Sequence, residues 1–265
     1  IGIAIAKPKL SLKTQLKTSA DGWGNLTMKF TLKALAVAAV ASASSFTFAD
    51  EPTSPHSVSG NIGVLSSYNL RGITNVPENS GATLQGGLDY NHASGFYAGW
   101  WGSTLDYSLA EEGRDAFENN FYLGYSHAVN DDLGLTIGTT YYYYYESDVE
   151  SNGFELLLGM SYKDLGVTAQ TLLEDTTWGN AGDTYIKGTY SYALPNDFSL
   201  DTALGLYAYE KSGDFIEGTT ESFGFRHFDI GLSKPLGDTG VTASMNYIIG
   251  GYDRFDEKQK NKVVF

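Results

Sequence analysis

The sequence predicts an all-β protein, a transmembrane antiparallel up-and-down β-barrel of 12 strands with a short last strand. Three observations predict this fold class. The chain is rich in glycine (31) and tyrosine (19), poor in proline (6), and contains no window that resembles a long membrane helix. From residue 57 onward, apolar and polar side chains alternate with the two-residue period of extended strands. The connections between these strands alternate between short turns and longer loops.

The clearest strand lies in residues 133–147. Leu133, Leu135 and Ile137 alternate with small or polar residues, and five consecutive tyrosines, residues 141–145, follow them. A tyrosine ring is apolar and its hydroxyl is polar, so a tyrosine band at the end of an apolar strand suits a membrane interface. A strand of a soluble sandwich with an aromatic end is the alternative on this stretch alone.

The strands follow one another as hairpins, each with an apolar and a more polar face. Trp100 and Trp101 leave the phase of the third strand open, because adjacent side chains of a strand point to opposite faces. The first five predicted strands are residues 57–71, 82–92, 96–107, 117–129 and 133–145. The others are residues 154–163, 166–175, 183–194, 198–210, 223–236, 240–252 and a stub at 262–265.

The order of the connections separates a membrane barrel from a soluble sandwich. Short turns follow the even strands and longer loops follow the odd ones, which is typical of outer-membrane barrels, whereas a sandwich has no reason to sort its loops. The phases predict four side chains that face lipid: Leu135, Leu158, Leu204 and Met245. They also predict a set of pore-lining side chains: Gln85, Asp89, Gln170, Lys187, Asp201, Asp229 and Asn246.

The chain divides into three predicted regions. Residues 28–49 have the form of a secretory signal peptide, with Lys29 and Lys33 before an alanine-rich apolar run and cleavage after Ala49. Residues 1–27 precede that signal without an initiating methionine, so we expect them to be an untranslated upstream segment. Residues 50–265 form the single barrel domain. Export followed by barrel insertion predicts the outer membrane of a Gram-negative bacterium as the location.

Charge limits the partners. The chain carries a net charge of −14, and residues 1–49 hold six of its 17 basic residues but one of its 31 acidic residues. The remainder has 11 basic and 30 acidic residues, a net charge of −19, which disfavours binding of nucleic acid. The expected partners are outer-membrane lipid and lipopolysaccharide, the barrel-assembly machinery during biogenesis, and small solutes or cations.

The sequence predicts no enzyme, cofactor or metal site. Cysteine is absent, which removes thiolate chemistry, and the acidic loops lack the spacing of a calcium-binding loop. Of the four histidines, only His227 could lie mid-barrel with a partner, because Asp229 is two residues away on the same strand face. A lumen histidine with a hydrogen-bond partner is the commoner explanation of such a pair than a catalytic one.

One stretch of the chain, residues 61–106, carries a family resemblance. The residues that carry it are Ser67, Tyr68, Leu70, Arg71, Gly72, Leu84, Gln85, Gly86, Gly87, Asp89, Tyr90, His92, Ser94, Gly95, Phe96 and Tyr97. With them, residues 61–106 resemble the start of the TorF family, a proteobacterial outer-membrane family that is described as porin-like and is of unknown function. The resemblance implies a barrel and a porin-like role, with no substrate and no catalytic residue. The final strand of that family is longer than residues 262–265, so either the chain is truncated or its closure against the first strand is incomplete.

Two functions remain open. The first is a porin-like channel for passive diffusion of ions or small solutes. We expect it to prefer cations, because acidic residues dominate its loops and predicted lumen. The second is a non-conducting structural or adhesive barrel with acidic surface loops, its lumen plugged by its own paired charges.

Overall fold

The structure is a computed structural model that describes residues 45–47, 54–75, 81–109 and 115–265. The predicted upstream segment, residues 1–27, lies outside the described residues. So does the predicted signal peptide, apart from residues 45–47.

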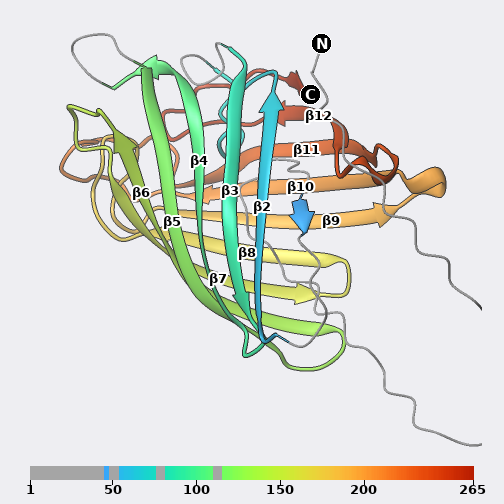
Figure 1. The fold of residues 1–265 in the computed structure, drawn as a ribbon. Helices are drawn as coiled ribbons and strands as arrows, with labels where there is room; N and C mark the ends of the chain where they lie inside the picture. The colour runs from blue at the N-terminus through green and yellow to red at the C-terminus, as the bar shows by residue number, and fades with distance from the viewer. Residues whose placement is uncertain (1–44, 48–53, 76–80, 110–114) are drawn as a thin grey trace, which may run out of the picture. The chain divides into compact units, whose positions relative to one another are not determined.

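Thirteen strands of the described chain form one antiparallel sheet in which each strand pairs with its neighbours in sequence (Figure 1). The first seven are β1 (Ser45–Thr47), β2 (His56–Leu65), β3 (Thr83–His92), β4 (Phe96–Ser108), β5 (Asp115–Ala128), β6 (Leu133–Tyr145) and β7 (Gly153–Tyr162). The others are β8 (Leu165–Leu172), β9 (Thr184–Ala193), β10 (Ser199–Ala208), β11 (Phe223–Pro235), β12 (Thr242–Gly250) and β13 (Lys262–Val264). Strands β2 to β13 make a nearly closed 12-stranded barrel, which confirms the predicted all-β antiparallel barrel and its short last strand.

The two edges of the sheet meet beside the end of β2. β13 pairs with β12, and the Ser66 amide donates to the carbonyl of Phe265 at 2.7 Å. The Phe265 amide in turn donates to Ser66 Oγ at 3.1 Å. β1 lies on the same edge of the sheet, where its residues pair with residues 59–61 of β2. The closure is therefore made by a few contacts rather than by a full ladder.

The barrel is apolar outside and polar inside. Leu135, Leu158, Leu204 and Met245 point outward as predicted and are 41–57% exposed. The large exposed hydrophobic side chains recur on every strand from β2 to β13, whereas a soluble protein of this size buries most such side chains. The alternating sequence therefore folds with its apolar face turned away from the barrel interior.

The five tyrosines at the end of β6 alternate between the two faces. Tyr141, Tyr143 and Tyr145 point outward, as an interface band requires, but Tyr142 and Tyr144 are buried inside the barrel, at 6% and 7% exposure. Consecutive side chains of a strand point to opposite faces, so three of the five tyrosines lie on the outer surface and two lie inside. The same rule resolves the phase of β4, because Trp101 is buried inside and Trp100 is half-exposed.

Several predicted strands end earlier than expected at the long-loop end of the barrel. β2 ends at Leu65 rather than at Arg71, β8 at Leu172, β10 at Ala208 and β12 at Gly250. Single backbone bonds still join some residues beyond these points to a neighbouring strand, such as Leu173 to Phe154 of β7 and Gly251 to Arg226 of β11, each at 2.8 Å, but the regular ladder has ended. Among the described residues the helices are single 3₁₀ turns, Pro195–Asp197 and Gly237–Thr239, and neither is long or apolar enough to cross a bilayer.

Candidate functional site in the barrel lumen

Residues 66–75, called the inner loop below, leave β2 and fold into the barrel interior. Arg71 and Gly72 have left-handed backbone conformations, with φ of 49° and 73°, and these reverse the chain direction. A Cβ atom on Gly72 would lie 2.4 Å from Cβ of His227, so only glycine fits there. The predicted continuation of the first strand through Arg71 is therefore wrong, because this turn carries the side chains inward.

Arg71 crosses the lumen and binds strands on its far side. Its guanidinium donates to both carboxylate oxygens of Glu155, at 2.8 and 2.6 Å, and to the hydroxyls of Tyr142 and Tyr207, each at 3.0 Å. The guanidinium also lies over the ring of Tyr185, 5.0 Å from its centroid. We call Arg71 and Glu155 the arginine clamp. A bidentate pair of this kind fixes the direction as well as the position of the arginine.

Tyr68 fixes the start of the inner loop against a second buried carboxylate. Its hydroxyl donates to Glu118 on β5, and the other oxygen of Glu118 accepts from Asn120 Nδ2 at 2.8 Å. The Tyr68 ring packs in a cluster of buried aromatic and aliphatic side chains that includes Trp101 and Tyr144. Glu118 is 1% exposed, so its two hydrogen bonds are what make its burial tolerable.

The far end of the inner loop is bound to the last long connection, residues 251–261. The amide of Thr74 donates to the side chain of Gln259 at 3.1 Å, and its hydroxyl donates to the carbonyl of Lys260 at 2.5 Å. Asn75 Nδ2 donates to Glu257 at 3.2 Å. The described part of the inner loop is thus held at both ends and in the middle.

A cavity of about 130 Å³ lies in the lumen beside the inner loop. Three of the predicted pore-lining residues, Gln170, Lys187 and Asp229, line it. The rest of its wall comes from the inner loop and from strands β4, β5, β6, β8, β9 and β11: Tyr68, Asn69, Leu70, Arg71, Gly72, Trp101, Glu118, Asn120, Tyr122, Thr140, Tyr142, Gly166, Thr168, Tyr185, Thr189 and His227.

His227 lies between two partners in this wall. Its Nδ1 is 2.8 Å from Asp229 Oδ1, as the two-residue spacing predicted, and its Nε2 is 2.6 Å from the hydroxyl of Tyr185. The ring is 2% exposed and both of its nitrogens are occupied. This is the arrangement of a histidine held in place by its neighbours.

The other four predicted pore-lining residues lie on inward faces but do not line the cavity. Gln85 is 5% exposed, Asp89 accepts a hydrogen bond from the hydroxyl of Tyr122, and Asn246 is half-buried opposite Gly231. Asp201 lies towards the short turns, where it accepts hydrogen bonds from three serines: Ser191, Ser199 and Ser233.

The sequence prediction did not identify Arg71 and Glu155, the two residues of the arginine clamp, as site residues. Arg71 was placed on a strand, and Glu155 was on the correct face of β7 but was not singled out. The sequence feature that could have identified Glu155 is its isolation, because Glu155 is the one charged side chain in the apolar run Phe154–Leu158. A charge in such a position needs a partner, and the inner loop supplies it.

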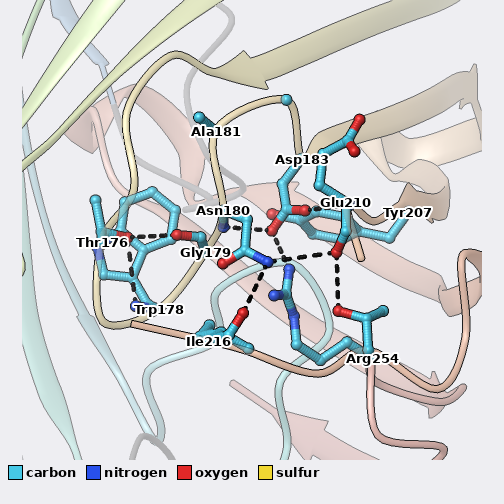
Figure 2. Close-up of polar contacts among 12 residues, drawn as sticks. Thr176, Trp178, Gly179, Asn180, Ala181, Asp183, Tyr207, Glu210, Ile216 and Arg254 are labelled. Carbon is cyan, nitrogen blue, oxygen red and sulfur yellow. Dashed lines mark hydrogen bonds and ion pairs between the residues drawn. The ribbon is translucent and has the colours of Figure 1, made fainter. Parts of the chain in front are cut away.

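Beyond the inner loop, three long connections bind one another at the barrel mouth (Figure 2). One carboxylate oxygen of Asp183 forms an ion pair with the guanidinium of Arg254. The other oxygen accepts a hydrogen bond from the backbone amide of Glu210 at 2.7 Å. Asn180 Nδ2 donates to the carbonyls of Glu210 and Ile216, each at 3.3 Å. We call this set, in residues 173–183, 209–222 and 251–261, the mouth clasp.

Asp175 joins two of these connections. Its two carboxylate oxygens accept the amides of Ala181 at 2.7 Å and Asp214 at 2.9 Å. These amides lower the pKa of the Asp175 carboxyl, because they stabilise its charged form. On the other side, Trp178 Nε1 donates to the carbonyl of Ser151 at 2.7 Å, which ties in the connection after β6.

Within the described parts of the chain, no group of three or more histidine, aspartate or glutamate side chains is placed to hold a metal ion. Most of the charged groups of the lumen are instead bonded to neighbouring side chains: Arg71 to Glu155, Glu118 to Tyr68 and Asn120, and Asp229 to His227. What the site offers is a small cavity lined by aromatic side chains and by charges of both signs.

Comparison with known proteins places the chain in a family. The search of curated proteins found no match, whereas a search of family models did. The family model described as "Bacterial protein of unknown function (Gcw_chp)" matches residues 49–261, which is most of the chain and nearly all of the barrel. That description names neither TorF nor a porin, so the porin-like role stays a prediction. The chain belongs to this bacterial family, Gcw_chp, whose function is unknown.

Proposed function

We propose that the protein is an outer-membrane barrel with a narrow diffusion channel for ions or small solutes, constricted by the inner loop. The observation that carries the proposal is the inverted distribution of side chains, with hydrophobic residues outside and a charged cavity inside. In a bilayer, closed barrels satisfy all backbone groups and turn apolar side chains to lipid. In water the same outer surface would favour aggregation.

Aromatic side chains on the outer surface support a membrane setting. Tyr141, Tyr143 and Phe223 are exposed towards the long loops, whereas Tyr162 and Tyr192 are exposed towards the short turns. Two such levels of amphipathic rings match the two interfaces of a membrane. Outer-membrane lipid and lipopolysaccharide would be the surroundings, and the barrel-assembly machinery would act during biogenesis.

The proposed channel is small for two reasons. A 12-stranded barrel is wider than an eight-stranded one, which its own side chains fill, but much narrower than a 16-stranded porin. The inner loop then occupies part of that width, because Arg71 reaches across to Glu155. Passage would be limited to ions and small solutes.

We propose a preference for cations. Acidic side chains outnumber basic ones in the described long connections, and they create a negative potential at the mouth. Inside the lumen the charges are more nearly balanced, since Arg71 and Lys187 face Glu118, Glu155 and Asp229. The mouth rather than the lumen would therefore set the preference, which should weaken as salt screens it.

A non-conducting structural or adhesive barrel is the second candidate. The arginine clamp and the mouth clasp favour it, since both bind loops across the opening that a solute would use. In this case the acidic mouth would be a surface rather than a vestibule.

Planar-bilayer recording under a KCl gradient tests the two candidates. We expect a small conductance with a reversal potential that favours potassium, and a larger conductance for Arg71→Ala, which removes the constriction. Lys163→Ala, at a short turn where the lysine is 58% exposed, is the matched control and should conduct like the original protein. A potential that favours chloride would contradict the cation preference. Absence of conductance in both the original protein and Arg71→Ala would support the non-conducting barrel.

A further inference from the structure

Four charged side chains line the lumen cavity: Arg71, Glu118, Lys187 and Asp229. Arg71 is committed to the arginine clamp, and Glu118 to a tyrosine and an asparagine, as described above. The remaining two differ from them, because they retain unused capacity for hydrogen bonding. They therefore define the part of the cavity that a ligand could engage.

Lys187 is the uncommitted cation. Among the described residues its ammonium has no hydrogen-bond or ion-pair partner, although it stands half-buried in the cavity wall. Asp229 is the uncommitted anion, because its Oδ1 is engaged by His227 while its Oδ2 has no partner in the described part of the chain. The two charges do not form an ion pair with each other, since no nitrogen–oxygen distance between them is within 4.0 Å.

The register explains why these charges stay apart. Lys187 on β9 pairs with Gly205 of β10, and Asp229 on β11 pairs with Ala203 of β10. Two strand spacings, about 9.6 Å, and an offset of two residues along the strand, about 6.8 Å, therefore separate their backbones, which places them about 12 Å apart. Gly205 and Ala203 have no side chain larger than a methyl group. Strand β10 itself therefore places no polar side chain between the cation and the anion, and the rings of His227 and Tyr185 lie over Gly205.

His227 keeps Asp229 in this position. A neutral ring that donates from Nδ1 to Asp229 and accepts at Nε2 from the Tyr185 hydroxyl satisfies both contacts. His227 is then a positioning residue for Oδ2 of Asp229.

We propose that Lys187 and Asp229 bind a small zwitterion, such as a short α-amino acid, with its carboxylate on Lys187 and its ammonium on Asp229. The size of the cavity sets the size of the ligand. An engineered protein cavity of about 150 Å³ admits benzene, so 130 Å³ suits a molecule of about five or six non-hydrogen atoms.

A ligand of one sign fits this site less well. A simple anion on Lys187 would approach Asp229 and Glu118, and a simple cation on Asp229 would approach Lys187 and Arg71. Each would also leave one charge of the pair without a partner in a confined space, which is costly. A zwitterion pairs both groups and adds no net charge.

The biological meaning of this inference rests on the proposed function, since the bound zwitterion would be a solute in transit. The binding test does not depend on whether the barrel conducts. Isothermal titration calorimetry of the refolded full chain in detergent, at pH 7, would compare glycine with two probes of similar size. Glycolate replaces the ammonium of glycine by a hydroxyl, and ethanolamine replaces the carboxylate. We expect glycine to bind at least about tenfold more tightly than either, the loss of one charged hydrogen-bonded contact.

Two variants test the assignment of each end. Lys187→Met should weaken glycine and glycolate but not ethanolamine, whereas Asp229→Asn should weaken glycine and ethanolamine but not glycolate. Lys163→Met, an exposed lysine at a short turn, is the matched control and should bind all three probes like the original chain. If Asp229→Asn does not refold, the opposite response of glycolate and ethanolamine to Lys187→Met still decides the assignment.

Glycolate or ethanolamine binding as tightly as glycine would overturn the proposal in favour of a single-charge site, and absence of glycine binding would overturn it altogether. Conductance of the same preparation in KCl separates this result from the channel. Glycine binding by a silent barrel would retain the site and remove the channel, whereas conductance without glycine binding would do the reverse.

Discussion

The two ends of the barrel are held together in different ways. At the short-turn end the side-chain contacts of a turn lie within its own hairpin or reach the next turn. Asn130 Oδ1 accepts the amides of Asp132 at 3.0 Å and Leu133 at 2.9 Å, and the Lys163 amide donates to the carbonyl of Asp132 in the adjacent turn at 2.9 Å. At the long-loop end the contacts join residues far apart in the chain, such as Arg71 with Glu155 and Asp183 with Arg254. One end is thus specified by local turn chemistry, and the other by pairing between loops.

The largest expected effect is on the arginine clamp. Arg71→Met leaves Glu155 buried without its partner, so we expect a loss of about 3–5 kcal/mol in the free energy of unfolding. The measurement is urea unfolding of the barrel in lipid vesicles. The double variant Arg71→Met with Glu155→Met should recover much of the loss, because it removes both charges. An equal loss in the double variant would mean that the charge pair is not what holds the inner loop.

The second prediction concerns the walls that connect the two ends. Leu158→Arg, on the outer face of β7, should cost about 2–4 kcal/mol of barrel stability in a bilayer. Gln170→Arg, on the inner face of β8, should cost much less, because the lumen is polar and Glu155 lies beside it. Unfolding in the same vesicles compares them. Equal costs would show that the outward face does not contact lipid.

The third prediction tests the local character of the short turns. Asn130→Ala removes both side-chain hydrogen bonds of its turn, and we expect a loss of about 0.5–1.5 kcal/mol. Hydrogen exchange should show faster exchange at the Asp132 amide and no change in the mouth clasp. Altered protection in residues 209–222 would argue that the two ends are coupled.

The smallest expected effect is a pH response at the mouth. The pKa of Asp175 is lowered in the folded loops, so its contribution is complete above the unfolded pKa and is lost as pH falls through the folded value. Residues 209–222 should therefore become more accessible to an acid-stable protease in acid. Asp175→Asn should show this accessibility already at neutral pH, with less further change. A pH response equal to that of the original chain would assign it to another carboxylate.

The difference between local contacts at the short turns and distant contacts at the long loops also explains which parts of the structure could be predicted from the sequence. The hairpin of β5 and β6 could be predicted, because alternation and a polar turn are local signals. The inner loop could not, since Tyr68 and Leu70 continue the alternation of β2 although the chain has already turned inward. The turn depends on Gly72 fitting against His227 and on a carboxylate 84 residues away. Likewise Lys187 and Asp229 could be placed on the inner face, but their separation depends on the register of β10.

The contacts of the inner loop bear on the order in which the barrel is assembled. This loop is near the start of the barrel, yet its partners lie up to 186 residues later, on β5 to β11 and in the last long connection. None of these contacts exists until the later strands have been made and the sheet has curved round. Contacts between distant residues form slowly, because a long loop must be closed before they stabilise anything. The inner loop would therefore be among the last parts to settle, after a barrel with an open interior has formed.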